Sequence, residues 1–300
     1  MKLSLYSSIG WRHPLGLGHV VSLARATGYD LVSIRGRSTD TRAPDLQQVQ
    51  AVGYDMLSAY ASDPEGVAAL KAMMEERGVG VYCLSTYATF IDPDPSVRQD
   101  SVQRIRRAVE FAPSLGAPIV RSIGHVVNDA PYDRQEIASW FDDGIRQLMG
   151  DLKRHDVRVQ IENCERAYPE TAAEVNQILA AHDGGRVVAA FDPVNSVFSG
   201  LDPVTEFEAL RTMPDAIHVK DVAKGPGGFQ WVPVGTGVVD WGRIIRTARE
   251  RGFDGVFVCE YVNPHKLSDF HGWERLMTPE EWARDTASFL KDTWSGQRAS

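Results

Sequence analysis

Residues 187–192 read VVAAFD, five apolar residues in a row followed by an aspartate. An uninterrupted apolar run of this length is typical of a strand that is buried on both faces, as in a parallel sheet. Similar runs occur before and after this stretch, at intervals of roughly 30 to 50 residues, which suits strands joined by helices and not by hairpins. The sequence predicts eight strands: Leu3–Tyr6, Leu31–Arg35, Val79–Leu84, Pro118–Ser122, Val157–Glu162, Val187–Asp192, Ala216–Lys220 and Val256–Glu260.

The segments between these runs carry helix signals. Thr171 is followed at the right spacing by Glu174, and Thr278 by Pro279 and Glu281, as at helix N-termini. Asp240 is placed to cap another helix. A βα unit repeated eight times forms either a closed barrel or a doubly wound open sheet, and eight units favour the barrel. We therefore predict an α/β fold, a single-domain (β/α)₈ TIM barrel over residues 1–300, with a C-terminal helical extension at about 273–294.

The overall composition indicates a globular protein without a preference for nucleic acid. The chain has 300 residues, a formal net charge of −8, and 43% hydrophobic residues. An acidic surface repels phosphate backbones, so we expect no nucleic-acid partner. The N-terminus lacks a long apolar signal segment, and no apolar run reaches the roughly 18 residues that a membrane span needs. The three cysteines follow no CxxC spacing and lie in or beside apolar runs. We expect a cytoplasmic protein with reduced cysteines.

Polar residues gather where four consecutive predicted strands end. In a closed parallel barrel, neighbouring strand ends lie roughly 5 Å apart, so these side chains should meet at one side of the barrel mouth. Three carboxylates at such distances repel one another, and a divalent cation removes that cost. The donor set suits Mn²⁺, Co²⁺ or Mg²⁺, and Zn²⁺ is compatible with it. The predicted ligands are Glu162, Asp192, His218 and Glu260.

Each of these residues has an ordinary structural alternative. An acidic residue that ends a strand is often a helix cap or a surface charge, and a lone histidine in an apolar strand is more often a hydrogen-bonded core residue than a ligand. Four such residues on successive strands make coincidence much less plausible than for any one of them.

The motifs around these residues resemble the xylose isomerase-like barrels, in particular the sugar isomerases and epimerases related to tagatose 3-epimerase. The matching segments are VQIEN with Glu162, FDPVN with Asp192, IHVKD with His218, PVGTGVVDW at 233–241, and VFVCEY with Glu260. The resemblance is strongest from Val157 to Tyr261. It implies that the four residues bind one divalent metal and that Glu162 and Glu260 are the catalytic acid/base pair. We expect Mn²⁺ first, with Mg²⁺, Co²⁺ and Zn²⁺ as the other candidates.

The resemblance further implies an isomerase or epimerase of carbohydrate metabolism. Proton transfer would proceed through a metal-stabilised enediolate of a sugar, a sugar derivative or a polyol. Lys220, Asn195, His125 and Arg35 are predicted to contact the substrate, and Arg121 follows the fourth strand close enough to reach the same pocket. Relatives of this kind are often homodimers or homotetramers. The second predicted strand ends in Val32-Ser33-Ile34-Arg35, where many members of the family have a glutamate.

Three other functions compete with this prediction. A dehydratase, similar to the inosose and dehydroshikimate dehydratases, shares the four residues and the first proton abstraction, and then loses a β-leaving group. An apurinic-site endonuclease shares the fold but resembles a multi-zinc centre with more histidines. The third alternative is a barrel without enzymatic activity, whose carboxylates no longer have a function. The intact set of four ligands argues against this alternative.

Overall fold

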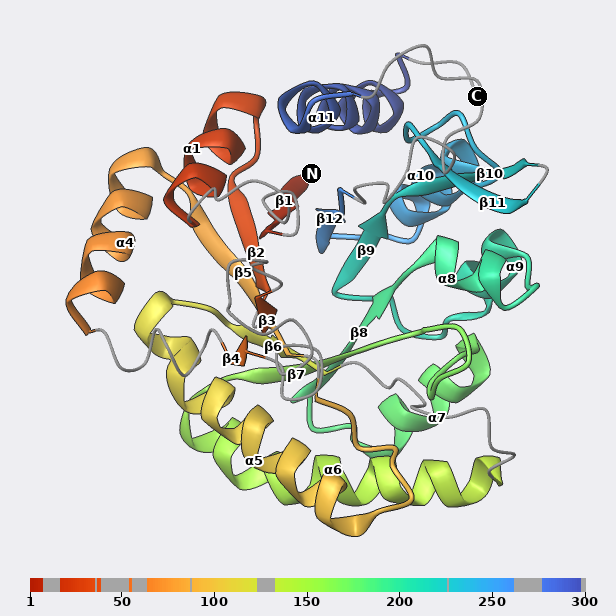
Figure 1. Ribbon diagram of the computed structural model, residues 1–300. Helices are drawn as coiled ribbons and strands as arrows, with labels where there is room; N and C mark the ends of the chain where they lie inside the picture. Colours follow the sequence, from red (N-terminus) through yellow and green to blue (C-terminus); the bar gives the residue numbers. More distant parts are fainter. Residues whose placement is uncertain are drawn as a thin grey trace.

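Eight parallel strands close into a barrel in the computed structural model, with helices around it (Figure 1). The structure describes residues 1–7, 17–35, 37–38, 54–55, 64–86, 88–122, 133–225, 227–261 and 277–297. The strands are hydrogen-bonded in the circular order β1-β12-β9-β8-β7-β6-β5-β2. This order confirms the predicted closed barrel, since an open sheet would leave two edge strands unpaired.

All eight predicted strands are present, each with its ends within two residues of the prediction. The barrel strands are β1 (Lys2–Tyr6), β2 (Leu31–Arg35), β5 (Gly80–Ser85), β6 (Ile119–Arg121), β7 (Arg158–Glu162), β8 (Val187–Phe191), β9 (Ala216–Val219) and β12 (Val256–Cys259).

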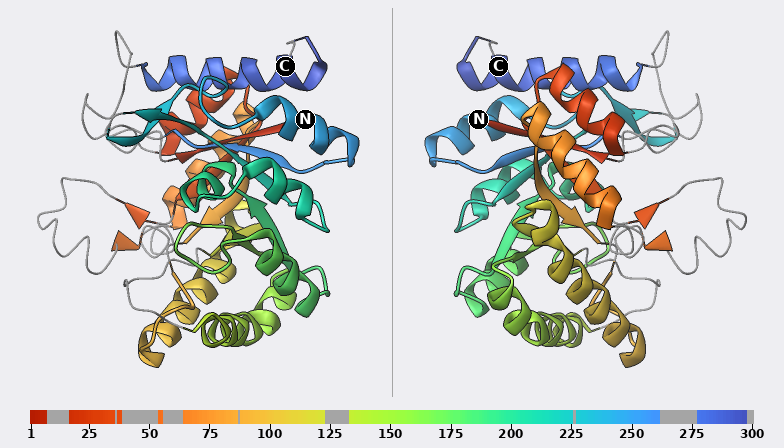
Figure 2. Two further views of the ribbon diagram at one scale, coloured as in Figure 1. Left: turned by 90° about the vertical axis from the view of Figure 1, so that its right-hand side faces the viewer. Right: turned by 90° about the vertical axis from the view of Figure 1, so that its left-hand side faces the viewer.

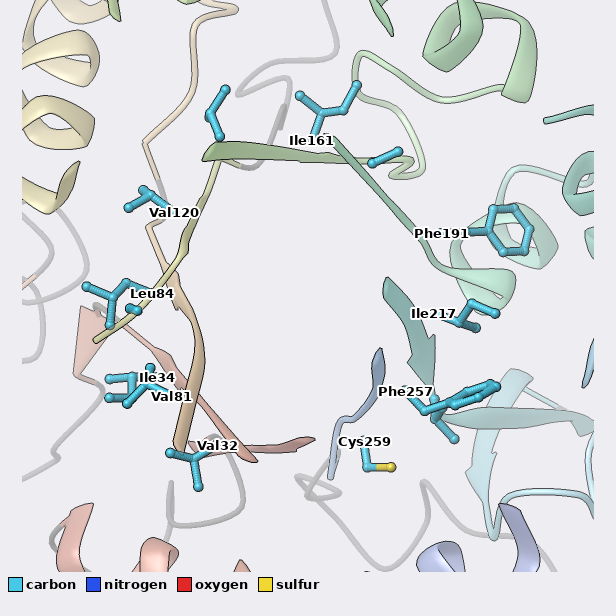
Figure 3. Packing of buried hydrophobic residues seen from close by; sticks show 14 of the residues in the cluster. Val32, Ile34, Val81, Leu84, Val120, Ile161, Phe191, Ile217, Phe257 and Cys259 are labelled. Carbon is cyan, nitrogen blue, oxygen red and sulfur yellow. The ribbon is translucent and has the colours of Figure 1, made fainter. Parts of the chain in front are cut away.

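Side chains alternate between the outside and the inside of the barrel along each strand. Val120, Ile161 and Phe191 are buried and point away from the ring of strands, toward the helices (Figure 3). Their neighbours in the sequence, Arg121 and Glu162 among them, therefore point inward. Outward-facing residues such as these are apolar. Their burial against the surrounding helices removes apolar surface from water and stabilises the barrel.

Helices cover the barrel on the outside (Figure 1). Thr171 and Thr278 both form the capping boxes that the sequence predicted, and Asp240 caps the helix that follows it by accepting a hydrogen bond from Arg243 N. The helices are α1 (Leu17–Thr27), α4 (Pro64–Arg77), α5 (Pro95–Phe111), α6 (Arg134–Arg154), α7 (Ala172–Ala181), α8 (Pro193–Phe198), α9 (Pro203–Ala209), α10 (Trp241–Glu250) and α11 (Pro279–Ser295), with a 3₁₀ turn at Ala112–Leu115.

Helix α11 is the described part of the predicted C-terminal extension. It packs against α1 and α10 (Figure 1), and Tyr29 Oη donates a hydrogen bond of 2.9 Å to the carbonyl oxygen of Ala283. The helix thereby ties the end of the chain to its first βα unit and covers the barrel between α1 and α10.

Two short antiparallel pairs lie on the face where the barrel strands end: β3 (Arg37–Ser38) with β4 (Tyr54–Asp55), and β10 (Asp221–Gly225) with β11 (Gly228–Val232) (Figure 2). The sequence analysis predicted no strand between Lys220 and Val256, so it missed the β10–β11 hairpin. Aromatic packing accounts for it, because Phe229 and Trp231 lie with ring centroids 5.6 and 5.7 Å from that of Phe198 in α8. Active sites of barrel enzymes lie on this face.

The three cysteines are free and buried, as the sequence predicted. Cys83 lies in a small apolar cluster inside the barrel, together with Ile119, Ala190 and Val258. Buried polar residues share the interior with this cluster, among them Ser4 and Ser33, whose hydroxyls are hydrogen-bonded at 2.8 Å. None of the helices that the structure describes is long and apolar enough to cross a bilayer.

Candidate metal and acid/base site

The four predicted ligands converge at the C-terminal end of the barrel. Glu162 is the last residue of β7, His218 lies in β9, and Glu260 directly follows β12. Asp192 follows β8 and caps α8, where its Oδ1 accepts hydrogen bonds from the backbone of Val194 and Asn195. Strand register explains the convergence, because inward-facing positions on neighbouring parallel strands lie side by side.

His218 connects the two glutamates. Its Nδ1 lies 3.0 Å from Glu162 Oε1, 3.1 Å from Glu260 Oε1 and 3.9 Å from Asp192 Oδ2. One ligand atom from each of Glu162, His218 and Glu260 falls within 4.8 Å of the others. His218 and Asp192 are fully buried, and Glu162 is 5% exposed. These residues therefore form one compact, dehydrated cluster and not a set of separate surface charges.

Arg121, the last residue of β6, extends into the same cluster. Its Nη1 donates to Glu162 Oε2 at 2.8 Å and lies 3.3 Å from Glu260 Oε1. Its Nε donates to Ser85 Oγ at 2.8 Å, and its Nη2 donates to Tyr6 Oη at 3.0 Å. One guanidinium thus joins side chains that lie in, or directly after, four other strands of the barrel: β1, β5, β7 and β12.

Lys220 supplies a second cation. Its Nζ lies 2.6 Å from Asp192 Oδ2 and 3.0 Å from Glu260 Oε2. The lysine follows β9 two residues after His218, so both side chains point into the barrel. The sequence predicted that Lys220 contacts the substrate. Its ion pair with Asp192 offers a different role, in which the lysine neutralises a buried carboxylate.

Asn163 fixes the ends of β7 and β8 relative to each other. Its Oδ1 accepts from Asp192 N at 2.7 Å and its Nδ2 donates to Asp192 O at 3.0 Å. Asn195 completes the link, because its Nδ2 donates to Asn163 O at 2.9 Å. The contact described for Asn195 is therefore to the backbone, and its predicted contact with substrate stays a prediction.

The PVGTGVVDW motif is held by a carboxylate just after the site. Asp221 is buried and accepts hydrogen bonds from the backbone nitrogens of Gly235 at 2.9 Å and Gly237 at 3.2 Å. A side chain at Gly237 would place its Cβ 2.1 Å from Asp221 Oδ1. The second glycine of the motif is therefore required by the close approach of its backbone to a carboxylate that lies one residue beyond Lys220.

Opposite charges set the ionisation of the cluster. Burial by itself would raise the pKa of Glu162, but Arg121 and His218 outweigh it and hold this pKa at about 2. Burial would raise the pKa of Glu260 as well, and Lys220 and His218 hold it well below the usual range. Both glutamates are therefore carboxylates at neutral pH in the metal-free protein.

The two basic side chains are affected in the opposite direction. Burial lowers the pKa of His218, but the carboxylates of Glu162 and Glu260 raise it to about 9. Burial likewise lowers the pKa of Lys220, and Asp192 and Glu260 raise it well above the ordinary value. In the metal-free protein the carboxylates are thus compensated by cations of the chain itself.

The donor set fits a divalent metal. Two ligands of one ion lie at most about 4.2 Å apart, because each lies about 2.1 Å from it, so donors already within 4.8 Å need to move little. Asp192 Oδ2 is a buried oxygen that makes no hydrogen bond of good geometry, although Lys220 is close to it. The carboxylate and imidazole donors are those that Mn²⁺, Mg²⁺ and Zn²⁺ accept.

Two predicted substrate contacts lie beyond what the structure describes. His125 is outside the described residues, and so is the side chain of Arg35. Sequence reasoning missed Tyr6 and Ser85, which anchor Arg121. Their signal was weak: Tyr6 ends a predicted strand and Ser85 directly follows one, and inward-facing polar residues at such positions also occur in ordinary barrel interiors.

Comparison with known proteins agrees with the fold and the motifs. The model of the family described as xylose isomerase-like TIM barrel matches residues 21–293. The chain is 27% identical over 246 residues to the L-ribulose-5-phosphate 3-epimerase UlaE of Salmonella typhi. The aligned region covers 79% of this chain and 79% of the epimerase.

Two solved structures with the same fold illustrate its range. One is a crystal structure of IOLI protein with a binding zinc atom, with a TM-score of 0.76, 18% identity and 100% coverage of both chains. The other is the probable 3-DHS dehydratase AsbF of Bacillus anthracis, with a TM-score of 0.69 and 18% identity over 97% of this chain and 99% of the other. The chain belongs to the xylose isomerase-like TIM barrel family, and the predicted resemblance to the sugar epimerases of this family is confirmed.

Proposed function

We propose that this chain is a divalent-metal-dependent epimerase or isomerase of a sugar or sugar derivative. The observation that carries the proposal is the placement of Glu162 and Glu260, which bring carboxylate oxygens from two different strand ends to within 3.1 Å of the same nitrogen of His218. Two ionised carboxylates that lie this close together suit the removal of a proton and its return. The similarity to a 3-epimerase supports the same class of reaction.

Glu162, Asp192, His218 and Glu260 would hold the metal. When bound, the ion would acidify a C–H next to a substrate carbonyl and stabilise the negative charge of the enediolate. Mn²⁺ is the ion that we propose first, with Mg²⁺, Co²⁺ and Zn²⁺ as alternatives that the same donors accept.

The two glutamates would move the proton. Both glutamates are ionised at neutral pH, so either of them can accept a proton from carbon once a substrate lies against it. One carboxylate takes the proton from carbon. The other would take up a proton from solvent and return it to carbon, from the opposite face for epimerisation or at the neighbouring carbon for isomerisation, in which the hydroxyl proton also moves to the former carbonyl oxygen. The first glutamate would then release its proton to solvent, which restores both carboxylates. Lys220 would orient a substrate oxygen beside Glu260.

A dehydratase would use the same first step and differ in the fate of the enediolate. If a β-leaving group departs before the proton returns, the product is an enone. The two reactions are distinguished by their products. A multi-zinc nuclease centre has less support, because the residues that the structure describes contain a single cluster of three or more potential ligands.

The test is a substrate panel in D₂O with protein that has been stripped of metal and reloaded with Mn²⁺. Ketopentoses, ketohexoses and their phosphates, L-ribulose 5-phosphate included, are followed by NMR and by ultraviolet absorbance. We expect an epimer or isomer with one deuterium at the reacting carbon. Enone absorbance would establish the lyase instead, and unchanged substrates across the panel would contradict the proposal.

Two further expectations belong to the same proposal. We propose a cytoplasmic location, in line with the three reduced cysteines. We also propose that the chain assembles as a homodimer or homotetramer, which sedimentation of the purified protein would measure directly.

A further inference from the structure

Asp192 lies just beyond the last paired residues of its strand. The pairing of β8 with β7 ends at Ala190, opposite Glu162, and the pairing of β8 with β9 ends at Phe191, opposite Ile217. Asp192 is nevertheless completely buried. Because a buried backbone N–H and C=O each need a hydrogen-bond partner, those of Asp192 must find partners other than a paired strand.

The side chain of Asn163 supplies these partners. Its Oδ1 accepts a hydrogen bond of 2.7 Å from Asp192 N, and its Nδ2 donates one of 3.0 Å to Asp192 O. An adjacent strand would bond the same two backbone groups, so this buried side chain extends the sheet beyond the end of β7. Nδ2 also donates to Ser196 Oγ at 3.2 Å, so both amide hydrogens are used.

Helix α8 fixes the rest of Asp192. Asn195, in the first turn of α8, donates from its Nδ2 to Asn163 O at 2.9 Å. The helix also holds the aspartate carboxylate, because Asp192 Oδ1 accepts from Val194 N at 3.0 Å and from Asn195 N at 3.2 Å. Asp192 Oδ2 lies 3.9 Å from His218 Nδ1 and is the oxygen that remains to bind a metal ion.

We infer that Asn163 is a positioning residue that sets metal affinity: it holds Asp192 in place to bind the ion through Oδ2. This inference rests on the proposed metal dependence. Asn163 directly follows Glu162, so one side chain fixes two of the four proposed ligands relative to each other. Loss of a group that orients a metal ligand in this way typically lowers metal affinity by about 10- to 100-fold.

Asn176 makes the same kind of contact away from the site. It lies in α7, where its Oδ1 accepts from Arg211 N at 2.9 Å and its Nδ2 donates to Ala209 O at 2.9 Å. Helix α7 covers the outside of the barrel (Figure 1). Asn176→Ala thus removes two hydrogen bonds between an amide side chain and the backbone without affecting a proposed ligand, and it is the matched control for a general effect on stability.

The experiment measures the Mn²⁺ affinity of EDTA-stripped protein by calorimetry, together with thermal unfolding of the same samples. Asn163→Ala should bind Mn²⁺ about 10- to 100-fold more weakly than the wild type. Asn176→Ala should bind Mn²⁺ as tightly as the wild type. Without metal both variants should unfold at a lower temperature than the wild type, because each has lost hydrogen bonds to the backbone.

Asn163→Ser is the second variant, and it tests the inference even if the alanine variant does not fold. Serine keeps a polar group at this position, but its single hydroxyl is shorter than the amide and cannot bond Asp192 N, Asp192 O and Ser196 together. Its affinity for Mn²⁺ should therefore also be lower than that of the wild type.

The outcomes separate this inference from the proposed function. If the wild type binds Mn²⁺ and a folded Asn163 variant binds it equally well, the inference is overturned and the proposed function stands. An equal loss of affinity in Asn176→Ala would also overturn the inference, because the loss would then follow from lower stability. A wild type that binds no divalent metal would overturn both.

Discussion

Lys220 Nζ lies 2.6 Å from Asp192 Oδ2, in an ion pair in which the aspartate is completely buried and the lysine side chain is 12% exposed. The pair joins the ends of β8 and β9. Lys220→Met would leave a buried carboxylate without its cation, so we expect a loss of about 3–5 kcal/mol in the free energy of unfolding of the metal-free protein. Urea denaturation in the presence of EDTA measures this loss.

A surface ion pair supplies the comparison for Lys220→Met. Arg243 and Glu208 pair at 3.0 Å, but both are about half exposed, so Arg243→Gln should cost under about 1 kcal/mol. If Lys220→Met were no more destabilising than this control, the ion pair with Asp192 would not be a stabilising contact, and the lysine would be free for substrate.

Glu162→Gln and Glu260→Gln should each abolish turnover. A glutamine keeps the size of the side chain and accepts hydrogen bonds, but it cannot take up or return a proton, so we expect kcat to fall by about 10²–10⁴ or more. The measurement is kcat on the substrate found in the panel, with circular dichroism as a check on folding. Glu208→Gln on the surface is the matched control and should keep full activity. Full activity in either site variant would refute the acid/base assignment.

The stability of the metal-free protein should fall as the pH rises above neutrality. The pKa of His218 is raised from 6.5 to about 9 in the folded protein by Glu162 and Glu260, against the effect of burial. The folded state therefore binds a proton more tightly than the unfolded state, and this contribution is fully present below pH 6.5 and lost as the pH rises through 9.

Unfolding in EDTA between pH 6 and 10 measures this dependence. His218→Gln removes the titrating group and should flatten the slope between pH 6.5 and 9. A wild-type slope that persists unchanged in the variant would show that another group causes it.

Gly237 and Gly150 should respond to the same substitution in opposite ways. At Gly237 an added Cβ meets Asp221 Oδ1 at 2.1 Å and the carbonyl oxygen of Val222 at 2.4 Å, so Gly237→Ala should cost about 1–3 kcal/mol. At Gly150, inside α6, nothing lies within 4 Å, and Gly150→Ala should stabilise by up to about 1 kcal/mol. Thermal unfolding of the two variants checks both signs, and a neutral Gly237→Ala would contradict the tight packing of this loop on Asp221.

The sequence was sufficient for the barrel because its strands are coded locally. A run such as Val187–Phe191 is apolar on both faces, so each strand and its approximate ends can be read without knowledge of its neighbours. Capping residues such as Thr171 and Thr278 are equally local signals, and the structure confirms both. Because the strand ends could be predicted, the four predicted ligands could also be placed together at one side of the barrel mouth.

The features that the sequence analysis missed depend on contacts between residues that are far apart in the chain. Arg121 depends on Tyr6, 115 residues away, and on His218, 97 residues away, and a lone arginine at the end of a strand indicates neither partner. The β10–β11 hairpin depends on Phe198, which belongs to the preceding βα unit. Such contacts follow from closure of the barrel, which brings distant strand ends together only after the fold has formed.

The most direct test of the central claim is an anomalous difference map from a crystal of the Mn²⁺-loaded protein, recorded near the manganese absorption edge. We predict one strong peak per chain among the side chains of Glu162, Asp192, His218 and Glu260, about 2.0 to 2.3 Å from a donor atom of each. A map with no peak at these residues, or with its only strong peak elsewhere in the chain, would contradict the account.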